Sequence, residues 1–304
     1  RSPSRGLGDV YKRQNQLGFA EKTVFSGDKR VYMAEQFYDI TRPVIREYHS
    51  KFIRQSVNAF HGSNGVVHSI GLEYTGPLHF MNFWLEEVHA CDNHQLVALT
   101  ATKDVQDAVL KDKKHASMVD VIDIRQWHYR ADGTLYEPQG GISLAPRQHA
   151  RLIDPGTVSC ASVYRAVREY RRKYPDKAVV YNGSTARVPH NAMNWAVFMA
   201  GGSFAKVPPV DELPVYEKAS AFSPIDIQTD MDTQWVMGAV GKGYLGYCVK
   251  DEIHLDLAED GGMYKVFWID PDKGTVLKKD GRVKGGRKVT LKAPAENSVC
   301  FLQR

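Results

Sequence analysis

The sequence lacks several features that would place it in a well-defined class of protein. No uninterrupted apolar run approaches the ~18 residues of a membrane-spanning helix, so we expect no membrane span. It has four cysteines, and none lies in a CxxC pair or at a Cys/His spacing typical of metal sites. A P-loop, an HExxH motif and a GxSxG motif are also missing, so we expect no cofactor and no metal ion.

The charge is mild and gives no sign of a nucleic-acid partner. The net charge of +5 is spread along the chain, as on an ordinary solvated surface. The basic run Arg165–Lys173 lies on an expected helix with an apolar opposite face, and we interpret it as the solvated side of that helix. Cys248 and Cys300 either pair in an oxidising compartment or stay buried as small hydrophobic thiols.

Helix and strand patterns alternate over much of the chain. Residues 1–14 have no periodicity and look like translated adaptor sequence, so we set them aside as a non-native segment and leave any signal peptide open. The pattern beyond them predicts a parallel sheet with right-handed crossovers. The expected strands are 66–72, 96–101, 119–124, 178–181 and 202–205. The expected helices are 41–60, 78–88, 105–110, 158–174 and 191–200. Three of them carry an apolar stripe at helical spacing that we expect to be buried: Ile45, Tyr48, Phe52, Val57 and Phe60 in the first, Met81, Trp84, Leu85 and Val88 in the second, and Val163, Val167 and Tyr170 in the fourth.

These five units predict an incomplete barrel of the α/β class. A full (β/α)8 TIM barrel takes ~250 residues, whereas residues 15–206 hold about five βα units, so we expect a truncated barrel that has lost its first strands. Residues 207–225 carry four prolines and read as a linker. From 226 to 304 the period changes to two, and about seven short strands separated by turn signals predict a small all-β, immunoglobulin-like sandwich.

The stretch Val66–Pro77 is the most informative for chemistry, because an apolar run ends on one carboxylate, Glu73, just before a Gly-Pro turn. In a βα barrel the carboxyl ends of the strands form the active site, so Glu73 is our candidate for a catalytic carboxylate. Its alternative role is a structural carboxylate bonded to an arginine or to loop amides. Asp104 and Asp123 follow or end the next two strands and are candidates for the second carboxylate that glycoside hydrolysis needs.

Further candidates follow the third of these strands. Period two places Asp123, Arg125 and Trp127 on one face, so an Asp123–Arg125 ion pair is the structural alternative to catalysis. The candidate substrate-binding residues mix aromatic rings with hydrogen-bond donors, as sugar sites do; the alternative is that they anchor loops. They are Tyr74, Arg125, Trp127, His128, Tyr129 and Arg147, with His149 beside the last.

Four segments together resemble a bacterial family. Glu73-Tyr-Thr-Gly-Pro77, Lys103–Asp107, Asp123–Trp127 and Ala145–Gln148 are similar to apiosidase-like relatives of clan-A glycoside hydrolases. Val266–Gly274 resembles the immunoglobulin-like, putative collagen-binding domain that follows such barrels. The resemblance covers residues 37–304 and implies a periplasmic or secreted protein that acts on an oligo- or polysaccharide.

The resemblance also implies roles for particular residues. Glu73 takes the position of the clan-A acid/base, although Leu72 stands where the family has Asn, and the segment Val180–Gly183 ends without the nucleophilic carboxylate. Our leading hypothesis is therefore a glycoside hydrolase-like protein acting on a plant or microbial polysaccharide, with Glu73 as general acid/base in the full-length protein; we expect the truncated barrel by itself to be inactive. The alternatives are a non-catalytic carbohydrate-binding protein or pseudoenzyme, and an adhesion module that works through the C-terminal sandwich. Sugar specificity, stereochemistry and oligomeric state stay open.

Overall fold

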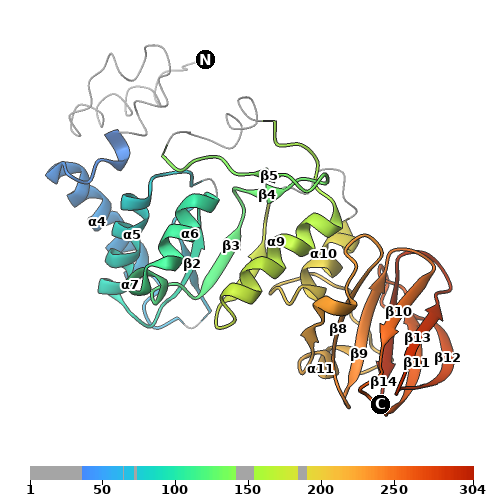
Figure 1. Cartoon of the computed structure of the whole chain (residues 1–304). Coiled ribbons are helices and arrows are strands. Elements are labelled where there is room, and N and C mark those ends of the chain that lie inside the picture. Colours follow the sequence, from blue (N-terminus) through green and yellow to red (C-terminus); the bar gives the residue numbers. More distant parts are fainter. Residues whose placement is uncertain (1–35, 64, 72–73, 142–153, 184–189) are drawn as a thin grey trace, which may run out of the picture. The chain divides into compact units, whose positions relative to one another are not determined.

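The chain forms two compact units. The computed structural model describes residues 36–63, 65–71, 74–141, 154–183 and 190–304 (Figure 1). The first unit comprises residues 1–127 and 136–155, and the second comprises 128–135 and 156–304. In the part of the chain that is described, no helix is both long and apolar enough to cross a membrane.

The first unit consists of parallel strands joined by helices. Strands β1, β2 and β3 lie side by side in that order and run parallel, as the alternating pattern predicted; β2 and β3 are labelled in Figure 1. Every residue of β3 is buried, and β2 is buried after its first residue. The elements are α4 (Pro43–Asn58), β1 (Val67–Ser69), α5 (Leu78–Cys91), β2 (Leu96–Thr100), α6 (Lys103–Lys111), α7 (Lys113–Ala116) and β3 (Val121–Ile124).

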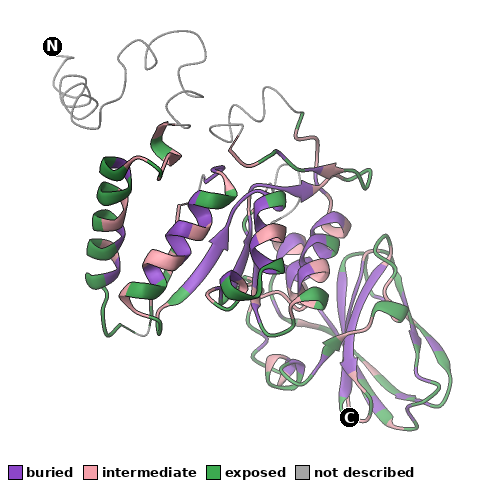
Figure 2. Cartoon of the chain, turned by 60° about the vertical axis from the view of Figure 1, so that its left-hand side comes forward, coloured by how far each residue is buried: buried purple, intermediate pink, exposed green. Residues whose placement is uncertain are grey.

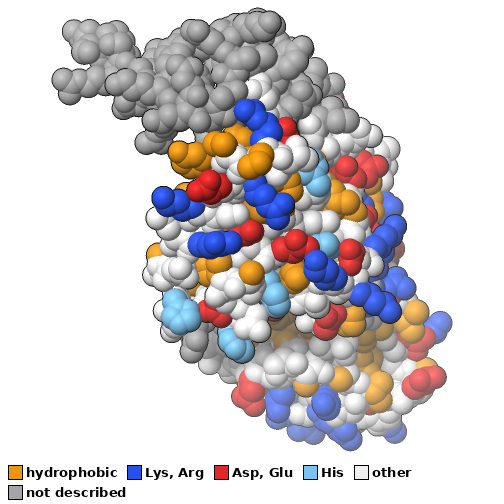
Figure 3. Space-filling view, turned by 90° about the vertical axis from the view of Figure 1, so that its left-hand side faces the viewer, with side chains coloured by type: hydrophobic (Ala, Val, Ile, Leu, Met, Phe, Trp, Pro, Cys, Tyr) orange, Lys and Arg blue, Asp and Glu red, His pale blue; other side chains and the backbone are white. Residues whose placement is uncertain are grey.

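Helix α5 confirms its predicted apolar stripe, but α4 does not. Met81, Trp84, Leu85 and Val88 of α5 are all buried. In α4 the buried residues are Ile45, Ile53 and Val57, which lie four or eight positions apart on one face. The prediction that Tyr48, Phe52 and Phe60 share that face was wrong: they are 54%, 70% and 49% exposed. Figure 3 shows this side of the first unit, where hydrophobic side chains lie among charged ones.

Strand β1 also differs from its prediction. It is three residues long rather than seven, and Val67 is 41% exposed. Among the strands of the first unit β1 lies at the end of the row, and an end strand gains cover from one neighbour only. The apolar run therefore predicted correctly that a strand lies here, but this strand is shorter and less buried than predicted.

The second unit begins with short strands and continues with helices. Its first elements are β4 (His128–Tyr129), β5 (Leu135–Tyr136, through which the unit boundary runs), α9 (Cys160–Lys173), β6 (Ala178–Tyr181), α10 (His190–Met199) and α11 (Val215–Ala219). Helix α9 starts with a capping box formed by Ser159 and Ser162, and it buries Val163, Val167 and Tyr170 as predicted. The expected strand 202–205 is wrong: this segment after α10 is irregular, and its Phe204 has a φ of 56°.

A β-sandwich makes up the rest of the second unit. The main antiparallel sheet has the order β12-β11-β14-β9-β8-β7, and β10 pairs with β13 in a second sheet. The strands are β7 (Ser223–Pro224), β8 (Gln234–Ala239), β9 (Gly243–Cys248), β10 (Glu252–Asp256), β11 (Met263–Ile269), β12 (Val276–Lys284), β13 (Lys288–Lys292) and β14 (Ser298–Gln303), with a 3₁₀ turn η1 at Asp226–Gln228.

The two sheets share one hydrophobic core. Both sheets carry many buried residues (purple in Figure 2). Side chains from both, such as Leu255 of β10 and Trp268 of β11, belong to the same cluster. Cys248 and Cys300 also lie in this core as free, fully buried thiols. Asp280-Gly281, one of the turn signals that we expected to separate strands in 226–304, does not do so, because β12 continues through it with a register shift opposite Lys265 and Phe267. The stretch predicted as a linker, 207–225, contains α11 and β7.

Candidate functional site

A row of polar side chains crosses the carboxyl ends of β1, β2 and β3. The Ser69 and Thr100 hydroxyls lie 3.1 Å apart, and the Thr100 hydroxyl donates to Oδ2 of Asp123 at 3.0 Å. Arg125, two residues beyond Asp123, donates from Nε to the same carboxylate oxygen at 3.1 Å. Parallel strands bring their carboxyl ends to one edge, and in βα proteins this edge is where ligands bind.

The two aspartates predicted to assist catalysis lie in different settings. Asp123 is 5% exposed and forms the ion pair with Arg125 that the spacing predicted as its structural alternative. Asp104 is exposed in the first turn of α6, where Thr102 Oγ1 donates to its Oδ1 at 2.6 Å. The backbone N–H of Gly140 donates to its Oδ2 at 3.0 Å. Asp104 therefore fastens the loop around Gly140 to the start of α6.

This loop packs against the segment that follows Glu73. The N–H of Gly141 donates to the carbonyl of Thr75 at 2.7 Å. A Cβ on Gly140 would lie 2.4 Å from Val105 Cγ2 and 3.0 Å from the carbonyl oxygen of Gly76, so only glycine fits here without a shift. Tyr74 is buried, donates its hydroxyl to the carbonyl of Pro77 at 2.9 Å, and has its pKa raised well above 10 by burial. The segment after Glu73, the loop around Gly140 and the start of α6 are thus held together by these contacts.

Several predicted residues fall outside the described part of the chain. Glu73 and its neighbour Leu72 are among them, as are Arg147 and His149. The catalytic role of Glu73 and the substrate-binding role of Arg147 therefore stay predictions.

Trp127 is anchored rather than presented to solvent. Its ring is fully buried, and its Nε1 donates to Oε1 of Gln106 at 2.7 Å. The ammonium of Lys103 lies 4.7 Å from the ring centroid. Gln106 in turn donates from Nε2 to the carbonyls of Leu99 (2.9 Å) and Asp123 (2.7 Å). This fully buried glutamine, which sequence reasoning missed, ties the ends of β2 and β3 to Trp127; the only signal was an amide among the apolar residues of α6.

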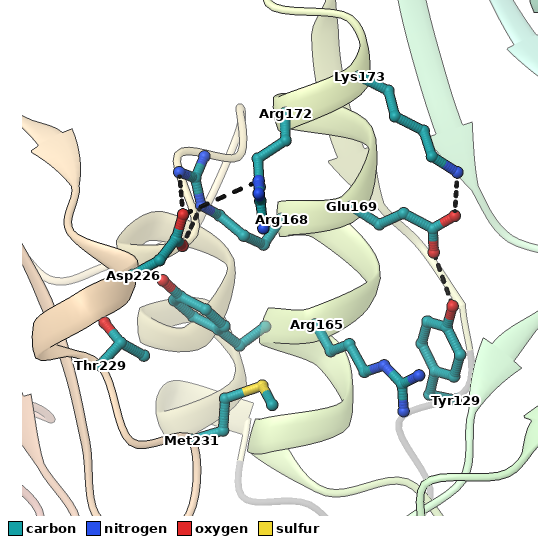
Figure 4. A pocket seen from close by; sticks show the side chains of 10 residues that line it. Tyr129, Arg165, Arg168, Glu169, Arg172, Lys173, Asp226, Thr229 and Met231 are labelled. Carbon is teal, nitrogen blue, oxygen red and sulfur yellow. Dashed lines mark hydrogen bonds and ion pairs between the residues drawn. The ribbon is translucent and has the colours of Figure 1, made fainter.

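The second unit holds a pocket along the exposed face of α9 (Figure 4). Its volume is about 500 Å³. The lining residues are Tyr129, Tyr164, Arg165, Arg168, Glu169, Arg172, Lys173, Asp226, Thr229 and Met231. Of the predicted binding residues in the second unit, Tyr129 lines this pocket, whereas His128 is buried with 3% of its surface exposed.

The basic side of α9 is therefore more than a solvated face. Arg168 forms a bidentate ion pair with Asp226, at 2.7 and 2.9 Å, and lowers the pKa of that carboxyl. Glu169 accepts the hydroxyl of Tyr129 at 2.7 Å and the ammonium of Lys173 at 2.6 Å. Residues 165, 168 and 172 recur at helical spacing in the sequence, but nothing there indicated that Asp226 and Tyr129 flank them.

A known family model matches most of the chain. Residues 10–222 match the family model described as "Domain of unknown function (DUF6298)", which is more than half of the 304 residues. The chain belongs to the DUF6298 family. The matched span includes the last part of segment 1–14 and ends before β7. A search of curated proteins finds no match. The resemblance of this DUF6298 member to apiosidase-like enzymes and to collagen-binding domains stays a prediction.

Solved structures that resemble the chain include several glycoside hydrolases. A family 44 xyloglucanase from Paenibacillus polymyxa is 12% identical, covers 84% of this chain and 70% of its own, and has a TM-score of 0.42. A family 44 endoglucanase from Clostridium thermocellum is 10% identical with the same coverage and a TM-score of 0.38. A β-xylosidase from Caulobacter crescentus is 11% identical, covers 84% and 74%, and scores 0.36. Identities and scores of this size support no argument about the activity of this chain.

Proposed function

We propose that this DUF6298 protein is a glycoside hydrolase-like protein that acts on a plant or microbial polysaccharide, with Glu73 as general acid/base. The observation that carries the proposal is the polar row Ser69–Thr100–Asp123–Arg125 across the carboxyl ends of three parallel strands. A parallel sheet is normally apolar, and buried polar groups are costly unless they are hydrogen-bonded, so such a row marks the edge of a site. In the sequence, Glu73 follows the end of β1 by four residues.

The neighbouring loops support a role for Glu73 in particular. Tyr74 directly after it is buried, and Thr75 and Gly76 are held by the Gly140–Gly141 turn. Withdrawal from water raises the pKa of a carboxyl and keeps it protonated as a proton donor. This is the state that protonation of a glycosidic oxygen requires.

The test compares the full-length protein with its Glu73→Gln variant on a panel of plant and microbial polysaccharides. Reducing ends released per unit time are measured, with Glu212→Gln, a change at an exposed carboxylate, as the matched control. We expect Glu73→Gln to lower turnover by roughly 10²- to 10⁴-fold, the contribution of a general acid/base, and Glu212→Gln to leave it unchanged. Glycan hydrolysis that survives Glu73→Gln would refute the proposal.

A second candidate is a carbohydrate-binding protein without hydrolytic activity. It is favoured by the state of Asp123 and Asp104, because Asp123 is buried in its ion pair with Arg125 and Asp104 holds Gly140. Neither is an unengaged second carboxylate of the kind that a hydrolytic pair needs. Binding of an oligosaccharide by the full chain, with no product released on long incubation, would favour this candidate over the first.

A further inference from the structure

The pocket on α9 has a surplus of positive charge. Four cationic side chains line it, Arg165, Arg168, Arg172 and Lys173, against the two carboxylates of Glu169 and Asp226, which leaves an excess of two. Figure 4 shows Arg168 and Arg172 reaching toward Asp226, and Glu169 and Lys173 lying on the side of Tyr129. The surplus therefore extends along the helix rather than gathering at one point.

Two of the four cations supply that surplus. Arg168 and Lys173 are matched by Asp226 and Glu169 at hydrogen-bond distance. Arg172, with 67% of its side chain exposed, comes no closer than 3.9 Å to Asp226, a carboxylate that Arg168 already engages in two hydrogen bonds.

Arg165 lies at the other end of the pocket. It donates to the carbonyl of Gly133 at 3.1 Å and lies 3.9 Å from the ring centroid of Tyr129, with no carboxylate partner among the described residues. Arg165 and Arg172 are seven residues apart, about two helical turns.

The other walls are suited to an organic ligand. Tyr164 is buried and held in place by stacking on Trp235, with ring centroids 5.9 Å apart and an interplanar angle of 11°. Met231 adds a flexible apolar surface, and Tyr129 presents an aromatic ring. A volume of about 500 Å³ falls within the ~300–1,000 Å³ range of small-molecule sites. A single inorganic anion would leave most of this space, and at least one of the two cation positions, unused.

We propose that this pocket binds an acidic oligosaccharide, whose carboxylate or sulfate groups pair with Arg165 and Arg172 while a sugar ring lies against the Tyr129–Met231 walls. Arginine is suited to this role because its planar guanidinium pairs with such groups through two parallel hydrogen bonds. The proposal rests on the proposed function, since it names the sugar class of the polysaccharide on which the protein acts.

The experiment measures binding to the full chain by isothermal titration calorimetry. The probes are trigalacturonate, a sulfated trisaccharide, neutral cellotriose and inorganic sulfate. We expect the acidic trisaccharides to bind at least about ten-fold more tightly than cellotriose, as charge-assisted hydrogen bonds permit. Their affinity is also expected to fall as NaCl is raised, because the exposed arginines are screened. A preference between the carboxylated and the sulfated probe identifies the source of the anion.

Arg172→Gln and Arg165→Gln test the residues themselves. Both side chains lie on the exposed face of α9, so the helix is expected to fold, and each change is expected to weaken acidic-sugar binding about ten-fold without changing cellotriose binding. Arg287→Gln, an exposed arginine outside the pocket, is the matched control.

Equal binding of acidic and neutral sugars, unchanged binding in both pocket variants, or inorganic sulfate binding as tightly as the acidic trisaccharides would each overturn the proposal. Because binding is read without turnover, loss of hydrolysis in Glu73→Gln with intact acidic-sugar binding separates the fate of the catalytic proposal from that of this one.

Discussion

Replacing Asp260 by Asn should make the β-sandwich less stable in a way that depends on pH. Asp260 is 4% exposed and lies between β10 and β11. Its Oδ2 accepts the hydroxyls of Tyr244 and Tyr264 and the N–H of Gly241, and its Oδ1 accepts the N–H of Gly262. One carboxylate therefore fastens the β8–β9 turn and two strands to the loop that carries it.

The size of the effect follows from the pKa of this carboxyl. Burial alone would raise it, but the four hydrogen bonds from Tyr264, Gly241, Tyr244 and Gly262 outweigh burial and lower the pKa of Asp260 to about 2, from 3.8. A difference of nearly two units corresponds to roughly 2 kcal/mol of folding free energy. Because the folded-state pKa is the lower one, this stabilisation is complete well above pH 4 and is lost as the pH falls from about 4 to about 2.

The assay is urea denaturation of the full chain, monitored by tryptophan fluorescence. We expect Asp260→Asn to lower the free energy of unfolding by about 2 kcal/mol at pH 7 and by about half as much at pH 3, because part of the wild-type Asp260 is then protonated in the unfolded state. Asp232→Asn, at an exposed aspartate, is the control and should change little at either pH. A deficit that is the same at both values, or absent at pH 7, would refute the reasoning.

Two further predictions concern the packing behind the candidate site and the start of α9. Gln106→Leu removes three buried hydrogen bonds and leaves Trp127 Nε1 unpaired. We therefore expect the free energy of unfolding, measured by urea denaturation, to fall by roughly 3 kcal/mol and the tryptophan emission to shift; an unchanged urea midpoint would show that these hydrogen bonds are dispensable. Ser159→Ala removes the capping box of α9 and should cost about 1 kcal/mol, whereas Ser159→Asp should retain most of the stability; equal stability of Ser159→Ala and wild type would contradict the capping role.

Periodicity in the sequence predicted most of the elements correctly where a pattern had strong signals at both ends. Helix α9 has a serine cap and a terminating proline around a regular apolar stripe, and its buried residues are those expected. Strand β6 was predicted to the residue. The prediction for α4 was wrong about its buried face because apolar residues occur on two sides of that helix, and periodicity alone does not say which side meets a neighbour.

In the candidate site, too, contacts between sequence neighbours were predicted and contacts between distant segments were not. The spacing of Asp123 and Arg125 predicted their ion pair, because two residues on one face of a strand are neighbours whatever the rest of the fold does. No spacing predicted that Gln106 would reach Trp127, or that Asp226 would meet Arg168 across 58 positions of sequence. These contacts join segments whose approach depends on the packing of the whole unit.

By itself, the sequence determined the local features of this protein: where strands and helices begin, the change from a mixed to an all-β pattern, and the carboxylate that follows the first strand. These are set by neighbouring residues through hydrogen-bond geometry and the two hydrophobic periods. Only the tertiary structure decided which polar groups are buried together and where basic residues line a pocket instead of a solvated face. Burial and charge pairing depend on distance in space, which the order of residues along the chain does not specify.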